Sequence, residues 1–199
     1  LGDVYKRQIK NLGKKIGNGL DELTLTTNGS QLERYAEFLK ENGVNRVNVS
    51  VDHLDPNKFR EITRWGDLDK VLVGIEKAKS VGIKVKINTV ALKDFNEKNI
   101  IEIIEWCCLN EHDMTLIEVM PMGDIGSINR FNQFSSLLDI HDKLSKKFDL
   151  VSIPKKTGGP ARYYNIKNKK IDLGYISPLT NNFCGSCNRV RLTCMGILY

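Results

Sequence analysis

Two cysteines near the C-terminus, Cys184 and Cys187, are separated only by a glycine and a serine. Two thiolates at this spacing can bind one metal centre, because the intervening turn directs both toward the same point. Zinc and an iron–sulfur cluster would each need further ligands, so both metals remain open. Cys194 could supply a third ligand, although a small packed hydrophobic side chain is the reading we favour for it.

Two arginines follow the cysteine pair. Arg189 and Arg191 are separated by one residue, so on an extended strand their side chains would lie on the same side. Two guanidinium groups beside a metal centre suit an anionic ligand such as a triphosphate. Two solvated arginines are the alternative, and the neighbouring cysteines favour the binding site.

The elements that must position such residues alternate between strands and helices. This order predicts a mostly parallel sheet of βα units, with too few units for a closed eightfold barrel. The predicted fold class is therefore α/β, an open or partial TIM-like (βα) barrel. The predicted strands are 22–27, 46–51, 84–90 and 115–120, and the predicted helices are 31–42, 68–81, 97–110 and 134–148, with a short helix after Asp55-Pro56.

Polar residues gather at the C-terminal ends of the predicted strands, where functional groups of such folds collect. Thr26, Ser50 and Lys86 stand there together with asparagines, and Met120 ends the fourth strand. Hydroxyls and amides could hold a ribose or a base, and the lysine could meet a phosphate. Taken singly, each polar residue is also typical of a turn or cap, and Met120 of core packing.

Composition narrows the class of protein. The 199 residues are 41% hydrophobic with a formal net charge of +6, which fits a folded core and an anionic partner or ordinary solubility. The lysines are scattered, which disfavours a nucleic-acid surface. No apolar run reaches the ~20 residues that cross a membrane, and the first residues do not form a signal peptide. We therefore expect a cytoplasmic protein.

The cysteines and the order of the predicted elements give further expectations. An odd count of five cysteines argues against a disulfide scaffold, and we expect Cys107 and Cys108 to pack structurally, with Cys108 on the apolar side of its helix. We assign residues 1–8 to no element, 9–150 to the partial barrel, and 151–199 to a C-terminal extension. Two short strands are expected in that extension, 162–166 and 171–176.

Seven stretches of the sequence together resemble one family, the radical S-adenosylmethionine (SAM) enzymes of molybdenum-cofactor biosynthesis that cyclise GTP. They keep the family's order and nearly its spacing over about residues 20–199. The last of them is highly specific to this family. The stretches are LTLTTNG (23–29), RVNVSVD (46–52), GIKVKINTV (82–90), IEVMPMG (117–123), GGPARYY (158–164), ISP (176–178) and FCGSCNRVRLT (183–193).

The resemblance implies a radical SAM barrel with two [4Fe–4S] clusters. One cluster binds SAM and cleaves it to a 5′-deoxyadenosyl radical, and the second, held by three C-terminal cysteines, binds the guanine of GTP. The product would be (8S)-3′,8-cyclo-7,8-dihydroguanosine 5′-triphosphate, which cyclic pyranopterin monophosphate synthase takes further. The implied roles are SAM contacts for Ser50 and Met120, GTP contacts for Thr26, Lys86, Arg189, Val190 and Arg191, and cluster ligation for Cys184 and Cys187.

Departures from the family's pattern limit what this chain can do. The sequence contains no Cys-x-x-x-Cys-x-x-Cys motif, and Thr115 stands where the family usually has a basic residue. We therefore expect an incomplete copy, cut short at both ends, that cannot cleave SAM alone. Another radical SAM enzyme with an auxiliary cluster and a zinc-stabilised binding module remain as alternative functions. The oligomeric state is left open, a homodimer included.

Overall fold

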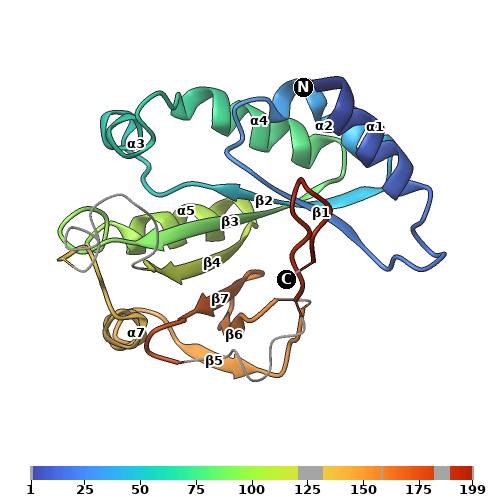
Figure 1. Ribbon diagram of the computed structural model, residues 1–199. Helices are drawn as coiled ribbons and strands as arrows, with labels where there is room; N and C mark the ends of the chain where they lie inside the picture. The colour runs from blue at the N-terminus through green and yellow to red at the C-terminus, as the bar shows by residue number, and fades with distance from the viewer. Residues whose placement is uncertain (1, 121–131, 158, 182–188, 199) are drawn as a thin grey trace. The chain divides into compact units, whose positions relative to one another are not determined.

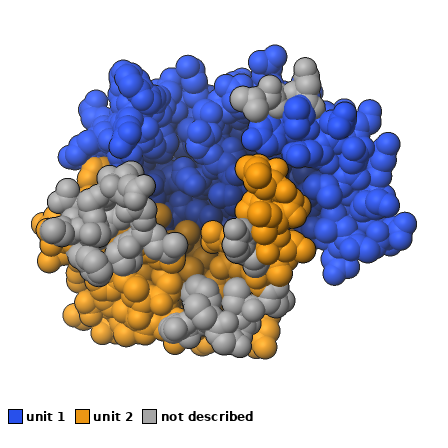
Figure 2. Space-filling view, in the orientation of Figure 1, with its two compact units in different colours: residues 1–89, 99–114 blue, residues 90–98, 115–199 orange. Residues whose placement is uncertain are grey.

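The structure, a computed structural model, describes residues 2–120, 132–157, 159–181 and 189–198. The chain divides into two compact units, shown in different colours in Figure 2. Unit 1 contains residues 1–89 and 99–114, and unit 2 contains residues 90–98 and 115–199. The predicted division of the chain near residue 150 follows a change in sequence character and stays a prediction.

Three parallel strands form the centre of unit 1, in the order β1 (Leu23–Thr27), β2 (Val44–Ser50) and β3 (Lys84–Ala91), the last of which ends in unit 2. The helices α2 (Leu32–Glu41) and α4 (Leu68–Ser80) connect them, and Figure 1 shows both helices along the same face of the strands. This βα order is the one that the sequence predicts.

Strand β2 shows why the helices cover only one face of this sheet. Val47, Val49 and Val51 are completely buried, whereas the alternating residues Arg46 and Asn48 are only partly buried. Successive side chains of a strand point to opposite faces, so the valines pack on one side and the polar residues line the other. Burial of these side chains is worth about 1.5–3 kcal/mol each relative to exposure and fixes the orientation of the sheet.

The other helices of unit 1 are α1 (Gly2–Gly13), α3 (Pro56–Thr63) and α5 (Ile100–Asn110). Helix α1 includes most of the eight residues to which the sequence analysis assigned no element. Helix α3 begins where Pro56 predicts, because the Asp55 side chain accepts hydrogen bonds from two backbone N–H groups of the first turn.

Helix α5 corrects two expectations. It begins at Ile100 rather than at residue 97, after a loop in which the Asn96 side chain accepts from the Leu92 N–H and donates to the Val90 carbonyl, both at 2.8 Å. Cys107, not Cys108, lies on its buried face. Desolvation raises the pKa of the Cys107 thiol far above its usual range, so this cysteine is a packing residue.

Unit 2 contains most of β4 (Asp113–Glu118), α7 (Leu137–Ser145) and three antiparallel strands that the sequence analysis only partly predicts. The strand order is β4, β7 (Asp172–Ile176), β6 (Arg162–Ile166) and β5 (Leu150–Ile153). Strands β6 and β7 match the expected pair, whereas β5 was not predicted because its four residues alternate weakly.

Together these elements confirm the predicted fold class. Parallel strands joined by helices are followed by a small antiparallel extension, which is the α/β partial-barrel arrangement expected from the sequence. Within the described ranges, no helix is both long and apolar enough to span a bilayer.

His112 lies buried in unit 1, just before β4. Its side chain is 2% exposed and its ring lies 5.4 Å from the ring of Trp106, while its buried Nε2 has no hydrogen-bond partner among the described residues. Desolvation, helped by the charge of Lys79, lowers the pKa of His112 below its usual value, against smaller opposite effects of Glu76 and Asp113. The folded chain therefore holds this imidazole neutral.

This burial predicts a pH dependence of stability. The unfolded chain binds a proton at His112 more readily than the folded chain, so the contribution of His112 is complete above pH ~6.5 and is lost as the pH falls below it. His112→Phe should flatten the pH dependence of the free energy of unfolding between pH 7 and 5, measured by urea denaturation. Equal slopes for the variant and the wild type would contradict this account.

Candidate functional site

Polar side chains line the uncovered face of the three parallel strands in unit 1. We call Thr26, Arg46, Asn48, Ser50 and Lys86 the polar strand face. The strand register pairs Thr26 with Asn48 and Asn48 with Lys86, so these three residues form one line across β1, β2 and β3. The sequence predicted Thr26, Ser50 and Lys86 as site residues at strand ends. Thr26 and Ser50 lie at the C-terminal ends of β1 and β2, whereas Lys86 lies near the start of β3, which continues to Ala91.

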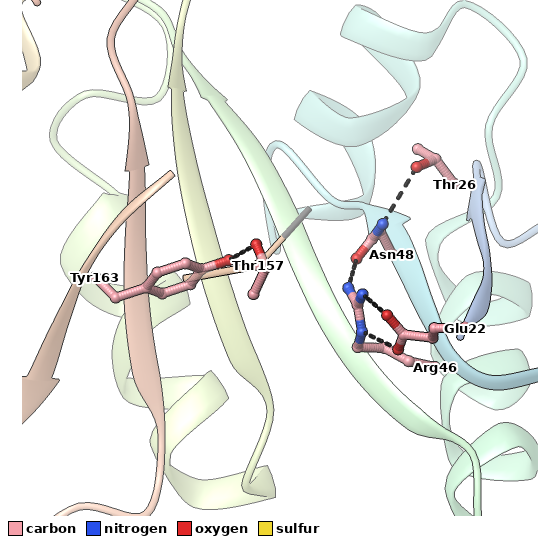
Figure 3. Close-up of polar contacts among 6 residues, drawn as sticks. All are labelled: Glu22, Thr26, Arg46, Asn48, Thr157 and Tyr163. Atoms are coloured by element: carbon pink, nitrogen blue, oxygen red, sulfur yellow. Dashed lines mark hydrogen bonds and ion pairs between the residues drawn. The ribbon is translucent and has the colours of Figure 1, made fainter. Parts of the chain in front are cut away.

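A chain of hydrogen bonds ties part of the polar strand face together (Figure 3). The Arg46 guanidinium donates to both carboxylate oxygens of Glu22, from Nε at 3.1 Å and from Nη2 at 2.8 Å. Its third nitrogen, Nη1, donates to Oδ1 of Asn48 at 3.2 Å, and Nδ2 of Asn48 donates to the Thr26 hydroxyl at 3.3 Å. Glu22, which directly precedes β1, and three residues of β1 and β2 thus form one connected network.

The charges in this network are complementary. The hydrogen bond from Arg46 lowers the pKa of the Glu22 carboxyl, with smaller contributions in the same direction from the charges of Arg46 and Lys86. Glu22 therefore stays ionised at neutral pH beside Arg46, and Lys86 lies in line with Thr26 and Asn48 across the strands. A lysine among neutral hydroxyl and amide groups suits an anionic ligand with hydrogen-bonding edges.

The turn after β1 requires its glycine. Gly29 has φ +78°, a conformation that residues with a Cβ rarely adopt, and a Cβ there would lie 2.8 Å from Cγ1 of Val71. The side chain of Asn28 accepts from both the backbone N–H and the hydroxyl of Ser30, which closes the turn. The Asn28-Gly29 pair therefore has a structural role, because it forms the turn that ends β1.

Ser50 ends β2 and pairs in register with Asn88 of β3. The Val51 N–H donates to the Asn88 carbonyl at 3.0 Å, and the Thr89 hydroxyl donates to the Val51 carbonyl at 2.6 Å, so the two strand ends are firmly joined. The buried side-chain oxygen Oδ1 of Asn88 has no hydrogen-bond partner among the described residues. Such an acceptor can take a hydroxyl or amine proton from a ligand.

Strand β4 ends in unit 2. Met120 follows this strand and is 42% exposed, so it is not the core side chain that a lone methionine suggests. Thr115, which stands where a basic residue was expected, is fully buried and its hydroxyl has no described partner. No charged contact to a ligand can therefore come from position 115.

Glu118 is a functional group of unit 2 that sequence reasoning did not single out. Its carboxylate is 1% exposed and accepts from the backbone N–H groups of Leu137 at 3.1 Å, Leu179 at 3.1 Å and Thr180 at 3.2 Å. The Thr180 hydroxyl donates to it as well. One carboxylate thereby joins β4, the first turn of α7 and the segment that precedes the cysteine pair.

A second polar cluster of unit 2 lies on the antiparallel strands. Tyr163 is 2% exposed, and its hydroxyl lies 3.1 Å from the hydroxyl of Thr157 (Figure 3). The Lys155 ammonium lies 5.1 Å from the centre of the Tyr163 ring and 2.6 Å from the Asp172 carboxylate. Through these contacts, Lys155 and Tyr163 stabilise the extension from within.

The predicted triphosphate contacts lie at the C-terminal end of unit 2. Arg189, Val190 and Arg191 are all exposed, and neither arginine forms an ion pair with a described residue. Cys184 and Cys187 lie outside the described residues. Cys194 is exposed in a short hairpin closed by the Leu192–Leu198 bridge, which does not fit the packed hydrophobic side chain we favoured.

No three His, Cys, Asp or Glu side chains converge as metal ligands in the part of the chain that the structure describes. The residues that sequence reasoning missed are Glu22, Arg46 and Glu118. All three are charged residues whose partners lie on other elements, and a charged residue within a strand pattern is the one signal that marked Arg46 and Glu118.

Two protein-family models match this chain, each over about one half of it. The model described as the Radical SAM superfamily matches residues 2–107, which is more than half of the 199 residues. The model described as Molybdenum Cofactor Synthesis C matches residues 112–199.

Individual proteins agree with these matches. The chain is 54% identical over 188 residues to the GTP 3',8-cyclase of Paracoccus denitrificans, covering 94% of this chain and 55% of that protein. It is 56% identical over 192 residues to the GTP 3',8-cyclase of Brucella ovis, covering 96% of this chain and 56% of that protein. The chain therefore spans about half the length of these relatives.

One solved structure shares the fold. The crystal structure of Streptococcus suis SuiB bound to S-adenosylmethionine superimposes with a TM-score of 0.51 at 16% identity, over 76% of this chain and 32% of that one. At this identity the likeness concerns the fold alone.

The Glu118 contacts generate a prediction for stability. Glu118→Gln keeps the shape of the side chain but replaces one acceptor oxygen with a donor that would face N–H groups. A buried donor left without an acceptor costs about 1–3 kcal/mol, so the free energy of unfolding should fall by about 2 kcal/mol in urea denaturation. Glu61→Gln, which breaks an exposed ion pair with Lys58, should cost well under 1 kcal/mol. Equal losses in both variants would contradict the role of Glu118.

Proposed function

Because this chain belongs to the radical SAM superfamily, we propose that it is part of a GTP 3',8-cyclase of molybdenum-cofactor biosynthesis. The proposed reaction converts GTP to (8S)-3′,8-cyclo-7,8-dihydroguanosine 5′-triphosphate. The observation that carries the proposal is the line of Thr26, Asn48 and Lys86 across three parallel strands, in a chain 54–56% identical to GTP 3',8-cyclases. The match of residues 112–199 to Molybdenum Cofactor Synthesis C supports the same pathway.

For GTP we assign the following contacts. Lys86 provides a positive charge for a phosphate, and the Thr26 hydroxyl provides a hydrogen-bonding group on the same line. Arg189 and Arg191, both exposed, suit the triphosphate because guanidinium groups bind phosphate oxygens in pairs. Val190 lies between them and would contribute through its backbone.

For SAM we assign Ser50 and Met120 as contacts. The unpartnered Oδ1 of Asn88, beside Ser50 in the strand register, is an observation that fits a hydroxyl-rich or amino-bearing cofactor at this edge. The [4Fe–4S] cluster of radical SAM proteins, when bound, supplies the electron that cleaves SAM. The part of this chain is to place the cofactor's hydroxyl and amino groups against Ser50 and Asn88.

Cys184 and Cys187 are the proposed ligands of a second [4Fe–4S] cluster, whose open iron site would bind the guanine. The segment before them is held by Glu118 through Leu179 and Thr180. We further propose that cyclic pyranopterin monophosphate synthase acts on the product, and that residues 9–150 and 151–199 form the barrel and the cluster-binding extension. A zinc-stabilised module is the competing function for the same cysteine pair.

The triphosphate contacts can be tested one by one. Arg189→Ala and Arg191→Ala should each weaken GTP binding by about 10- to 100-fold, because a hydrogen bond to a charged group is worth about 1.5–3 kcal/mol. Arg60→Ala, which removes an exposed arginine of α3, should leave the affinity unchanged. Equilibrium dialysis with GTP measures all three variants. Unchanged affinity in both Arg189→Ala and Arg191→Ala would rule out their triphosphate role.

A further inference from the structure

In the chain of hydrogen bonds on the polar strand face, it is fixed which atom donates and which accepts at each step. A guanidinium carries only donors, so the atom of Asn48 that faces Arg46 must be the amide oxygen. The amide nitrogen therefore faces Thr26 and donates to its hydroxyl oxygen at 3.3 Å. The orientation of the Asn48 amide thus follows from the chemistry of Arg46.

Arg46 is itself held in one position. It is bound to Glu22 through two hydrogen bonds of 3.1 and 2.8 Å, and its side chain is only 23% exposed. A two-point contact between guanidinium and carboxylate restricts the plane of the guanidinium, so its Nη1 stays directed at Asn48. Glu22 directly precedes β1, and Arg46 lies on β2, where it pairs in register with Thr24 of β1.

The consequence falls on the Thr26 hydroxyl. Its oxygen already accepts from Asn48, and no described residue accepts its proton. Thr26 is exposed, so the proton can point toward a ligand. We propose that Glu22, Arg46 and Asn48 are positioning residues that make the Thr26 hydroxyl a hydrogen-bond donor toward an acceptor atom of the nucleotide.

This inference rests on the proposed function, because it takes GTP as the ligand that meets Thr26. It also predicts which ligand atoms can bind the Thr26 hydroxyl, which the contact alone does not. A carbonyl oxygen, a ring nitrogen or a phosphate oxygen satisfies the Thr26 donor, whereas an amino group at the same place could use only the lone pair that Asn48 leaves and would leave the Thr26 proton without an acceptor, so it should bind less well. The three positioning residues would act without touching the nucleotide.

Asn48→Asp tests the direction of the chain directly. The aspartate has the same shape and keeps an oxygen for Arg46, but its second oxygen accepts the Thr26 proton and withdraws it from the ligand. GTP binding to the full chain, measured by equilibrium dialysis, should weaken about tenfold. Thr26→Val should produce a similar loss, and Thr26→Ser, which keeps the hydroxyl, should retain the affinity.

A double-mutant cycle separates this effect from simple charge repulsion. If Asn48→Asp acts through the Thr26 proton, it should cause no further loss in the Thr26→Val background. Repulsion between aspartate and GTP would instead persist in that background and would overturn the proposal. Asn45→Asp places the same charge on β2, where the residue bonds Lys40, and should leave GTP binding unchanged.

The remaining outcomes are also decisive. If Asn48→Asp fails to fold, as judged by circular dichroism, Arg46→Leu releases the amide and should weaken GTP binding only when Thr26 keeps its hydroxyl. Unchanged affinity in the folded Asn48→Asp variant, with normal binding by the wild type, would contradict the donor role and leave the proposed function intact. No GTP binding by the wild type would overturn the proposed function and this inference together.

Discussion

The register between β1, β2 and β3 is the constraint on which the candidate site depends. It is set by the buried valines of β2, which pack under the helices and cannot shift by one residue without exposing every apolar side chain. Once that face is fixed, Thr26, Asn48 and Lys86 must lie on one line of the opposite face. The positions of these polar residues in unit 1 therefore follow from the packing of its core.

Unit 2 uses a different device, a buried carboxylate. Glu118 holds backbone N–H groups of α7 and of the segment before the cysteine pair, so the end of β4 is tied to residues that lie about 60 positions later. In both units, charged side chains therefore hold neighbouring elements in place through hydrogen bonds within the protein. Glu22 with Arg46 in unit 1 and Glu118 in unit 2 have this same supporting role.

Sequence periodicity was sufficient for the parallel strands and their helices, because alternating burial leaves a strong pattern in β2 and β3. Periodicity did not predict which residues are buried in a helix that is nearly all apolar. Helix α5 is apolar almost all round, so its pattern could not show that Cys107 rather than Cys108 is buried. The hydrogen bonds of Arg46 and Glu118 could not be predicted either, since they join residues that are distant in the sequence and come together only through the packing of separate segments. Placement at predicted strand ends indicated Thr26, Ser50 and Lys86, and the resemblance to a family gave them roles, but neither indicated the residues that support them.

We propose that a nucleotide binds the polar strand face at the line of Thr26, Asn48 and Lys86. Lys84 and Lys86 lie two residues apart on β3, but Lys84 pairs in register with Arg46, farther from the strand ends. The most direct measurement is the affinity for GTP of Lys86→Met compared with Lys84→Met. The account predicts at least a tenfold loss for Lys86→Met and little change for Lys84→Met. Equal affinities for the two variants would contradict it.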